Sequence, residues 1–217
     1  MMQDEDALRW AVGRLQEVVE RLEGMLDPWP MYCQRDPRWA GDWLGPDEGG
    51  GTLGGSGCAV TCAAMVATAV GCVVTPGALN RWLCELGGFS SVGCAEPRNQ
   101  LRWEVMPAFC PLLEWKGRGS WRAGPADVTV IREAMERGPV VAEVDFDYRD
   151  MDVDQHFVVL LRWIGEDDLE IADPWDGARV GLVERYFNPR WSAPAGKVAR
   201  VITGLRVLQA AMVVTDG

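Results

Sequence analysis

The sequence contains a single histidine and lacks any long apolar run. The lone histidine, His156, excludes every metal site that needs two imidazole ligands, so any imidazole chemistry in this chain has to use it. The longest apolar stretch, from Ala59 to Val74, is interrupted by Thr61, Thr68 and Gly71. It is also shorter than the roughly 20 residues of a membrane-spanning helix. We therefore expect no membrane span.

Basic residues are also scarce. The 217 residues include 21 Lys and Arg against 32 Asp and Glu, which gives a formal net charge of −11 and argues against a nucleic-acid binder. The acidic start, Met-Met-Gln-Asp-Glu-Asp, has neither the basic region nor the apolar region of a signal peptide. We expect a globular protein that is cytoplasmic as synthesised, with one domain of ordinary size and a short appendage.

The seven cysteines do not form a metal-binding pattern. Cys58 and Cys62 are spaced for one helical turn, but no second pair follows at metal-ligand spacing, which argues against a zinc ribbon. The aspartates of residues 145–154 lack the glycine and the terminal glutamate of a calcium-binding loop. We therefore expect no metal and no cofactor. Without an export signal, the cysteines are expected to be free thiols rather than a disulfide framework.

The first 29 residues form a separate unit in this interpretation. Within residues 4–27 apolar side chains are spaced four and three apart, as in a heptad repeat. The positions are Leu8, Val12, Leu15, Val19, Leu22 and Leu26. The pattern suits a parallel two-stranded coil, whereas the wider apolar face made by Ala11, Val18 and Met25 suits a trimer or docking on the same chain. Residues 6–27 are thus a candidate for homo-oligomer formation or partner docking.

Residues 30–217 read as one α+β domain. A Trp-rich loop segment covers residues 31–57, and helices are predicted at 59–70, 75–87, near 98–106 and at 127–137. The pattern then changes to strands of an antiparallel sheet. We predict them at 139–146, 156–163, 168–173, 178–185, 199–207 and 209–215. Helices that precede strands are the α+β order.

Cys58 is the candidate nucleophile. Glycines precede it and a helix of small apolar residues follows, so its thiol should lie at a helix N-terminus. The unpaired N–H groups and the macrodipole there stabilise a thiolate. The alternative is a buried small hydrophobe, an interpretation that we apply to Cys62, Cys72 and Cys84.

His156 is the candidate base, and Asp173 is the candidate partner of its imidazole. His156 opens a predicted strand, where we expect the ring to be accessible at one end of the sheet. Asp173 ends the next strand, and facing ends of adjacent antiparallel strands can bring a carboxylate to an imidazole. Structural roles stay open for both, since a lone histidine is often a structural side chain and Asp-Pro initiates turns.

Several segments together resemble the bacteriocin-processing-peptidase-like (double-glycine-peptidase-like) family of papain-like cysteine peptidases. The first segments are Gln34-Arg35-Asp36-Pro37-Arg38-Trp39-Ala40, Leu44-Gly45, Gly57-Cys58-Ala59-Val60-Thr61 and Ala64-Met65. The later ones are Thr75-Pro76, Leu79-Asn80, Gly87-Gly88-Phe89, Gly138-Pro139-Val140, Gln155-His156-Phe157-Val158-Val159 and Ile171-Ala172-Asp173-Pro174-Trp175. They follow in order over roughly residues 32–180, and their joint occurrence is more specific than any one of them.

The resemblance implies a papain-like fold and a cysteine peptidase that hydrolyses a peptide or isopeptide bond. It assigns Cys58 as nucleophile, His156 as general base and acid, Asp173 as the residue that orients the imidazole, and Gln34 as an oxyanion-hole donor. The chain has no transporter span or ATPase module, so the processing of an exported leader does not carry over. The heptad segment lies outside the match.

Two other functions remain open. One is a peptidoglycan endopeptidase or amidase, for instance one carried by a phage particle. Eleven tryptophans would offer flat stacking surfaces for such a substrate, although the acidic charge is poorly suited to an anionic cell wall. The other is a structural or assembly protein on a retained peptidase fold, because a fold does not guarantee activity.

Overall fold

The computed structural model of the chain describes residues 14, 29–90, 99–121, 124–145, 155–189 and 195–211. The predicted heptad segment and the appendage 1–29 lie outside these residues except for Arg14 and Trp29. The aspartate-rich segment lies outside them from residue 146 to residue 154.

The helical part begins with short elements and continues with two longer helices. Its elements are η1 (Glu48–Gly50), α2 (Leu53–Ser56), α3 (Cys58–Ala69), α4 (Pro76–Glu85), η2 (Trp103–Val105) and α5 (Met106–Phe109). Thr75 caps α4 by accepting a hydrogen bond from the N–H of Ala78, and Pro76 occupies the first turn of the helix. The small residues of α3 are almost all buried, so this helix runs through the core.

A six-stranded antiparallel sheet forms the second part, with the strand order β3-β8-β4-β5-β6-β7. The strands are β3 (Leu113–Ser120), β4 (Val140–Asp145), β5 (Gln155–Trp163), β6 (Leu169–Asp173), β7 (Ala178–Gly181) and β8 (Ile202–Ala210). Strands β1 (Phe89–Ser90) and β2 (Gln100–Leu101) form a separate two-stranded sheet. Helices α6 (Val128–Arg137), α7 (Leu182–Tyr186) and α8 (Lys197–Val201) complete the described elements.

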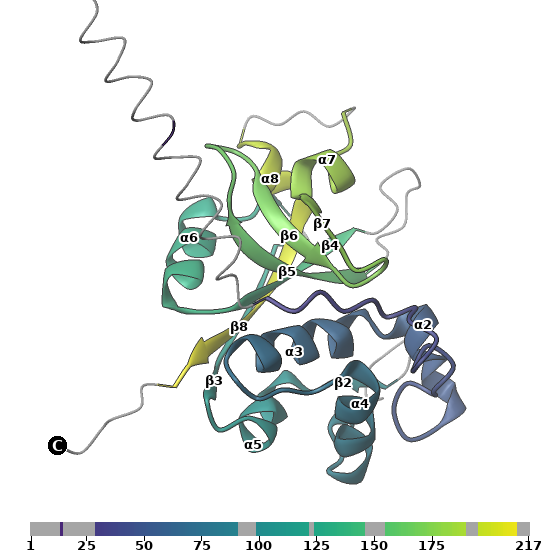
Figure 1. Cartoon of the computed structure of the whole chain (residues 1–217). Coiled ribbons are helices and arrows are strands. Elements are labelled where there is room, and N and C mark those ends of the chain that lie inside the picture. Colours follow the sequence, from purple (N-terminus) through teal and green to yellow (C-terminus); the bar gives the residue numbers. More distant parts are fainter. Residues whose placement is uncertain are drawn as a thin grey trace, which may run out of the picture.

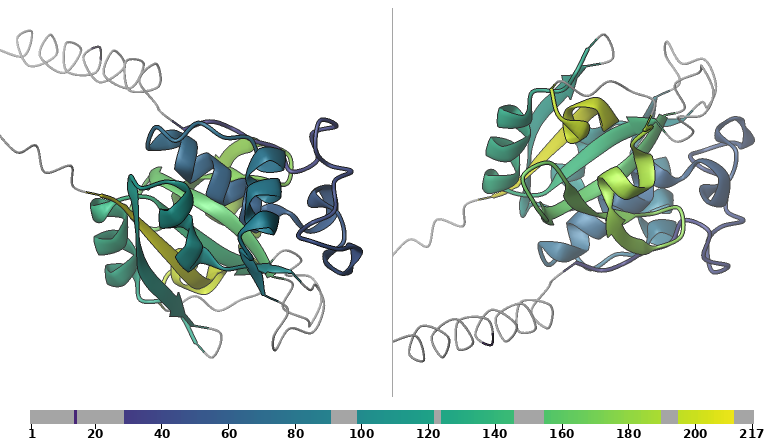
Figure 2. Two further views of the ribbon diagram at one scale, coloured as in Figure 1. Left: turned by 90° about the horizontal axis from the view of Figure 1, so that it is seen from below. Right: turned by 90° about the horizontal axis from the view of Figure 1, so that it is seen from above.

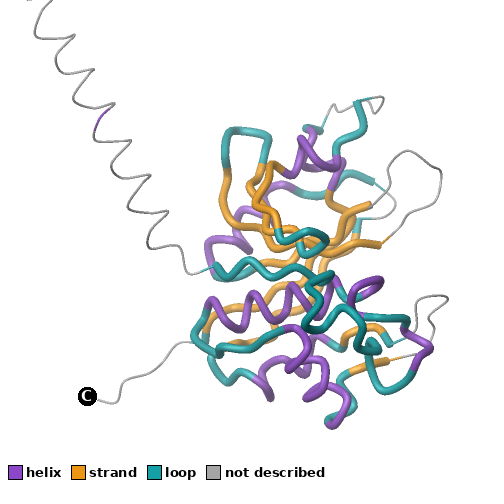
Figure 3. Tube along the Cα trace, turned by 45° about the vertical axis from the view of Figure 1, so that its right-hand side comes forward, coloured by secondary structure: helices purple, strands orange, loops and turns teal. Residues whose placement is uncertain are grey.

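The sheet lies between two groups of helices. Figure 1 shows α3, α4 and α5 on one side and α7 and α8 on the other, and the strand-rich and helix-rich halves are distinct in Figure 3. Figure 2 shows α6 alongside β8. The alternation of strand side chains produces the two faces: Val141 and Val159 belong to the core with α3, whereas Ala142 and Val158 belong to the core with α6, α7 and α8. The predicted α+β architecture with an antiparallel sheet is therefore confirmed.

Four of the predicted elements are wrong in whole or in part. The segment 98–106 contains β2 and η2, and its short α-helix begins only at Met106. The strand predicted over 178–185 ends at Gly181 and turns into α7. In place of the predicted pair of strands at the end of the chain, the residues described there, up to 211, form α8 and then the strand β8. Strand β3 was not predicted, since Gly117 and Gly119 lower the β-propensity of its sequence.

The expectation that all cysteines are free thiols is also wrong. Cys72 and Cys110 form a disulfide that joins the chain just after α3 to the end of α5. Cys62 is buried as predicted, whereas Cys84 is half-buried, and both are thiols together with Cys33 and Cys58. Cys94 lies outside the described residues.

No helix within the described ranges is long and apolar enough to cross a membrane.

Candidate functional site

Cys58 is the first residue of α3, as its sequence predicts. Gly57 precedes it as the N-cap, with no side-chain hydrogen bond to the helix. The N–H groups of the first helical turn have no partner within the helix, so they and the helix dipole surround the thiol with positive potential. The residue is 9% exposed.

His156 and Asp173 lie at facing ends of neighbouring strands, and their side chains are bonded to each other. The Nε2 atom of His156 lies 3.0 Å from Oδ1 of Asp173. His156 is 3% exposed and Asp173 is 0% exposed, so the imidazole is far less accessible than we expected from its position at the start of a strand.

Cys58 interacts with the same imidazole. Burial disfavours the charged ring, but the hydrogen bonds with Asp173 and Cys58 and the charges of both partners raise the pKa of His156 to about 9. An imidazolium between a carboxylate and a thiol is therefore favoured at neutral pH. The structure thus brings three of the four predicted site residues into one connected chain of side chains.

The carboxylate of Asp173 is held by further donors that the sequence did not indicate. Its Oδ1 accepts a hydrogen bond from the backbone N–H of Trp175 at 2.9 Å. Its Oδ2 accepts one from the hydroxyl of Tyr186 at 2.6 Å and lies 2.8 Å from Nε of Arg185. Burial alone would raise the pKa of Asp173, but the hydrogen bond with His156, the charge of that imidazole, and the hydrogen bonds from Tyr186 and Trp175 keep it below its ordinary value.

Tyr186 and Arg185 come from α7, the short helix that replaces the end of a predicted strand. Burial and the charge of Asp173 raise the pKa of Tyr186, so its hydroxyl remains protonated and donates. Arg185 also binds Oδ2 of Asp176 at 2.7 Å. No sequence signal identified these two residues, because their contact with Asp173 depends on how α7 packs over β6.

Gln34, the fourth predicted site residue, is hydrogen-bonded to α2 and to the turn after Asp173. Its backbone N–H donates to the carbonyl of Pro174 at 2.7 Å, which joins the segment around Gln34 to the turn after Asp173. Its side-chain Nε2 donates to the carbonyl of Gly54 at 3.1 Å, and Gln34 is 1% exposed. An amide nitrogen carries two hydrogens, so the bond to Gly54 leaves one for a further acceptor.

The other cysteine of α3 has a different environment. The thiol of Cys62 is completely buried and donates to the carbonyl of Phe157 at 3.3 Å. Burial, followed by the charges of Cys58 and Asp173, raises the pKa of this thiol well above its ordinary value. Cys62 is thus a structural residue, as we predicted.

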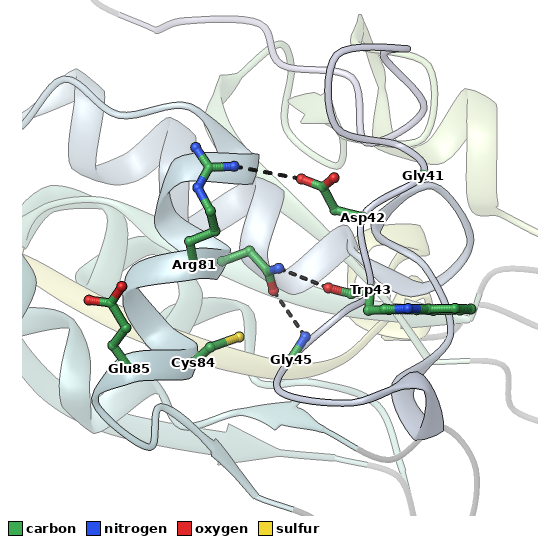
Figure 4. A pocket seen from close by; sticks show the side chains of 8 residues that line it. Gly41, Asp42, Trp43, Gly45, Arg81, Cys84 and Glu85 are labelled. Atoms are coloured by element: carbon green, nitrogen blue, oxygen red, sulfur yellow. Dashed lines mark hydrogen bonds and ion pairs between the residues drawn. The ribbon is translucent and has the colours of Figure 1, made fainter.

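A pocket of about 570 Å³ lies beside α4 and contains none of the predicted site residues. Its lining consists of Gly41, Asp42, Trp43, Gly45, Asn80, Arg81, Cys84 and Glu85. Figure 4 shows Arg81 reaching towards Asp42, while the indole of Trp43 extends away from the helix. Trp43 is 54% exposed. The backbone N–H of Leu53 donates to the carbonyl of Asp42 at 2.9 Å, so the pocket borders the segment that leads to Cys58.

Metal ligands are not gathered at the site or elsewhere in the described ranges, which hold no group of three or more His, Cys, Asp and Glu side chains suited to a metal ion. The chemistry available is that of a thiol, an imidazole, a carboxylate and an amide.

No protein-family model matches the chain, and a search of curated proteins finds no significant match.

Proposed function

We propose that this protein is a cysteine peptidase of the papain-like type, which cleaves a peptide or isopeptide bond through an acyl-enzyme. The observation that carries the proposal is the buried series of side chains from Cys58 through His156 to Asp173. Nucleophilic catalysis needs a nucleophile within reach of a base that a third group orients, and this arrangement meets that requirement.

In the first half of the reaction, the thiolate of Cys58 attacks the carbonyl carbon of the scissile bond. The oxyanion that forms would accept hydrogen bonds from the N–H of Cys58 and from the second hydrogen on Nε2 of Gln34. The imidazolium of His156 gives its proton to the leaving amine, the C–N bond breaks, and a thioester to Cys58 remains.

In the second half, water attacks the thioester and His156 takes a proton from it. The C–S bond breaks, the acid product leaves, and the thiolate–imidazolium pair is restored. Asp173 stays ionised throughout and holds Nε2, which leaves Nδ1 of the ring for Cys58 and the substrate.

The position of Asp173 supports a working site over a purely structural histidine. A buried carboxylate that only stabilised the fold would need enough donors, and Tyr186, Arg185 and Trp175 already supply three. The imidazole of His156 is a fourth hydrogen-bond partner of Asp173, and its ring also forms a hydrogen bond with the thiol of Cys58.

The test is hydrolysis of a proteome-derived peptide library, with purified peptidoglycan as a second substrate, by the wild type and by Cys58→Ala. Cleavage by the wild type alone supports the proposal, and release of peptidoglycan fragments alone would favour the cell-wall alternative. If the wild type cleaves neither substrate, the peptidase proposal fails, and this result favours a structural or assembly role for the protein.

The His156→Ala variant separates the roles within the site. It is expected to lose hydrolysis while it keeps the circular-dichroism spectrum of the wild type. Retained turnover would remove His156 from the mechanism.

A further inference from the structure

Arg35 lies between the segment of Gln34 and the turn that follows Asp173. It follows Gln34, whose backbone is bonded to Pro174, and its guanidinium carbon lies 4.8 Å from the centre of the Trp175 ring. Trp175 in turn donates its backbone N–H to Asp173. Arg35 therefore spans from the segment that carries the amide of Gln34 to the turn that carries the carboxylate.

The guanidinium of Arg35 has no carboxylate partner among the described residues. Arg38, three positions later, binds both oxygens of Asp36, at 2.9 and 2.7 Å. Arg185 binds Asp173 and Asp176. Arg35 is exposed, and in a chain with 32 acidic residues its charge is left open to an external anion.

Stacking on the indole makes Arg35 suitable for binding a carboxylate. A guanidinium that rests on an aromatic face loses rotamer freedom before it binds, and its planar fork matches the two oxygens of a carboxylate. Such charge-assisted bidentate pairs are among the stronger hydrogen-bonded contacts.

The proposed mechanism fixes the half of the substrate that Arg35 would meet. His156 gives its proton to the leaving amine, so the leaving half lies over the imidazole. Asp173 binds that ring from its Nε2 side, Trp175 donates its backbone N–H to Asp173, and Arg35 stacks on the indole of Trp175. We infer that Arg35, backed by Trp175, binds a carboxylate on the leaving half of the substrate, either an acidic side chain or a free C-terminus. This inference rests on the proposed function and adds the substrate class.

The experiment compares matched versions of the library peptide that the wild type cleaves fastest. One pair carries Glu or Gln in the first positions after the scissile bond, and a second pair ends there as the free acid or the amide. The wild type should prefer the charged member of at least one pair by about tenfold in kcat/KM, the size expected for one charge-assisted contact. The pair that shows the preference identifies the source of the carboxylate.

The variants assign that preference to one side chain. In Arg35→Ala, the ratio of kcat/KM for the charged peptide to kcat/KM for the neutral peptide should fall towards one. Arg35→Lys should keep part of the preference for the charged peptide. Arg38→Ala is the matched control, because it removes the same charge from an arginine that also stacks on a tryptophan but is already bound to Asp36. A wild type without preference, or a preference unchanged in Arg35→Ala, overturns the inference and leaves the proposed function standing.

A second measurement tests the role of Arg35 without substrate turnover. Iodoacetate and iodoacetamide differ mainly by one carboxylate, so the ratio of their rates at Cys58 reports the positive charge that an anion meets near the thiol. Arg35→Ala should lower this ratio severalfold, and Arg38→Ala should leave it at the wild-type value. Equal ratios in all three proteins would contradict the inference, even if no peptide is cleaved.

Discussion

Tyr186→Phe removes one hydroxyl from the candidate site and nothing else. That hydroxyl is buried and donates to a buried carboxylate at 2.6 Å. A hydrogen bond to a charged group contributes about 1.5–3 kcal/mol. Since Arg185 still binds the same oxygen, we expect the free energy of unfolding to fall by about 2 kcal/mol at pH 7.

The assay is urea denaturation at several pH values, with Tyr32→Phe as the control. The hydroxyl of Tyr32 lies 3.5 Å from Oγ1 of Thr68, too long for a strong hydrogen bond, so its removal should cost less than about 0.5 kcal/mol. The native pKa of Asp173 is lowered, so its contribution is complete above its ordinary pKa and is lost as pH falls through the native value. The difference in the free energy of unfolding between the wild type and Tyr186→Phe should therefore become smaller at acidic pH. Equal losses in both variants, or a difference independent of pH, would refute the reasoning.

Three further predictions concern the disulfide, the imidazole and the start of α3. Reducing the disulfide, whose cysteines are 38 positions apart, should lower the free energy of unfolding by about 4 kcal/mol in urea titrations with and without reductant. Because His156 must carry a proton for the leaving amine, kcat/KM should fall as pH rises through about 9, and Asp173→Asn should move this fall to lower pH. A Cβ at Gly57 would lie 2.4 Å from the carbonyl oxygen of Leu53, so Gly57→Ala should destabilise the fold strongly. A Cβ at Gly55 would meet only the hydroxyl of Thr52, at 3.5 Å, so Gly55→Ala should have little effect on the melting temperature.

The three residues of the candidate site could be predicted because each lies at the boundary of an element. Glycines and a run of small apolar residues identify Cys58 as a helix start, and the strand patterns place His156 and Asp173 at facing ends. Their burial was not predictable, since it depends on helices packed over the strand ends. The sequence pattern predicted an accessible imidazole at His156, whereas the fold buries it.

The contacts of Tyr186 and Arg185 with Asp173 were not predictable for a related reason. The residues of α7 read as the continuation of a strand, and the helix is too short for its own periodicity to be recognised. Likewise, α8 and β8 were mistaken for two strands, because tertiary packing overrides weak local preference in short apolar segments. The pairing of Cys72 with Cys110 depends on the three-dimensional path of the chain, which cysteine spacing alone does not give.

Competitive alkylation of the native protein tests the central claim most directly. Cys33 and Cys84 are more exposed than Cys58, so an ordinary thiol at Cys58 would react after them. With stoichiometric iodoacetamide at mildly acidic pH, followed by peptide mapping, we expect Cys58 to be modified first, because its thiol lies at the start of α3 and is hydrogen-bonded to the imidazole of His156. His156→Ala should abolish that priority. Uniform labelling of the thiols, or labelling that follows exposure alone, would contradict the account.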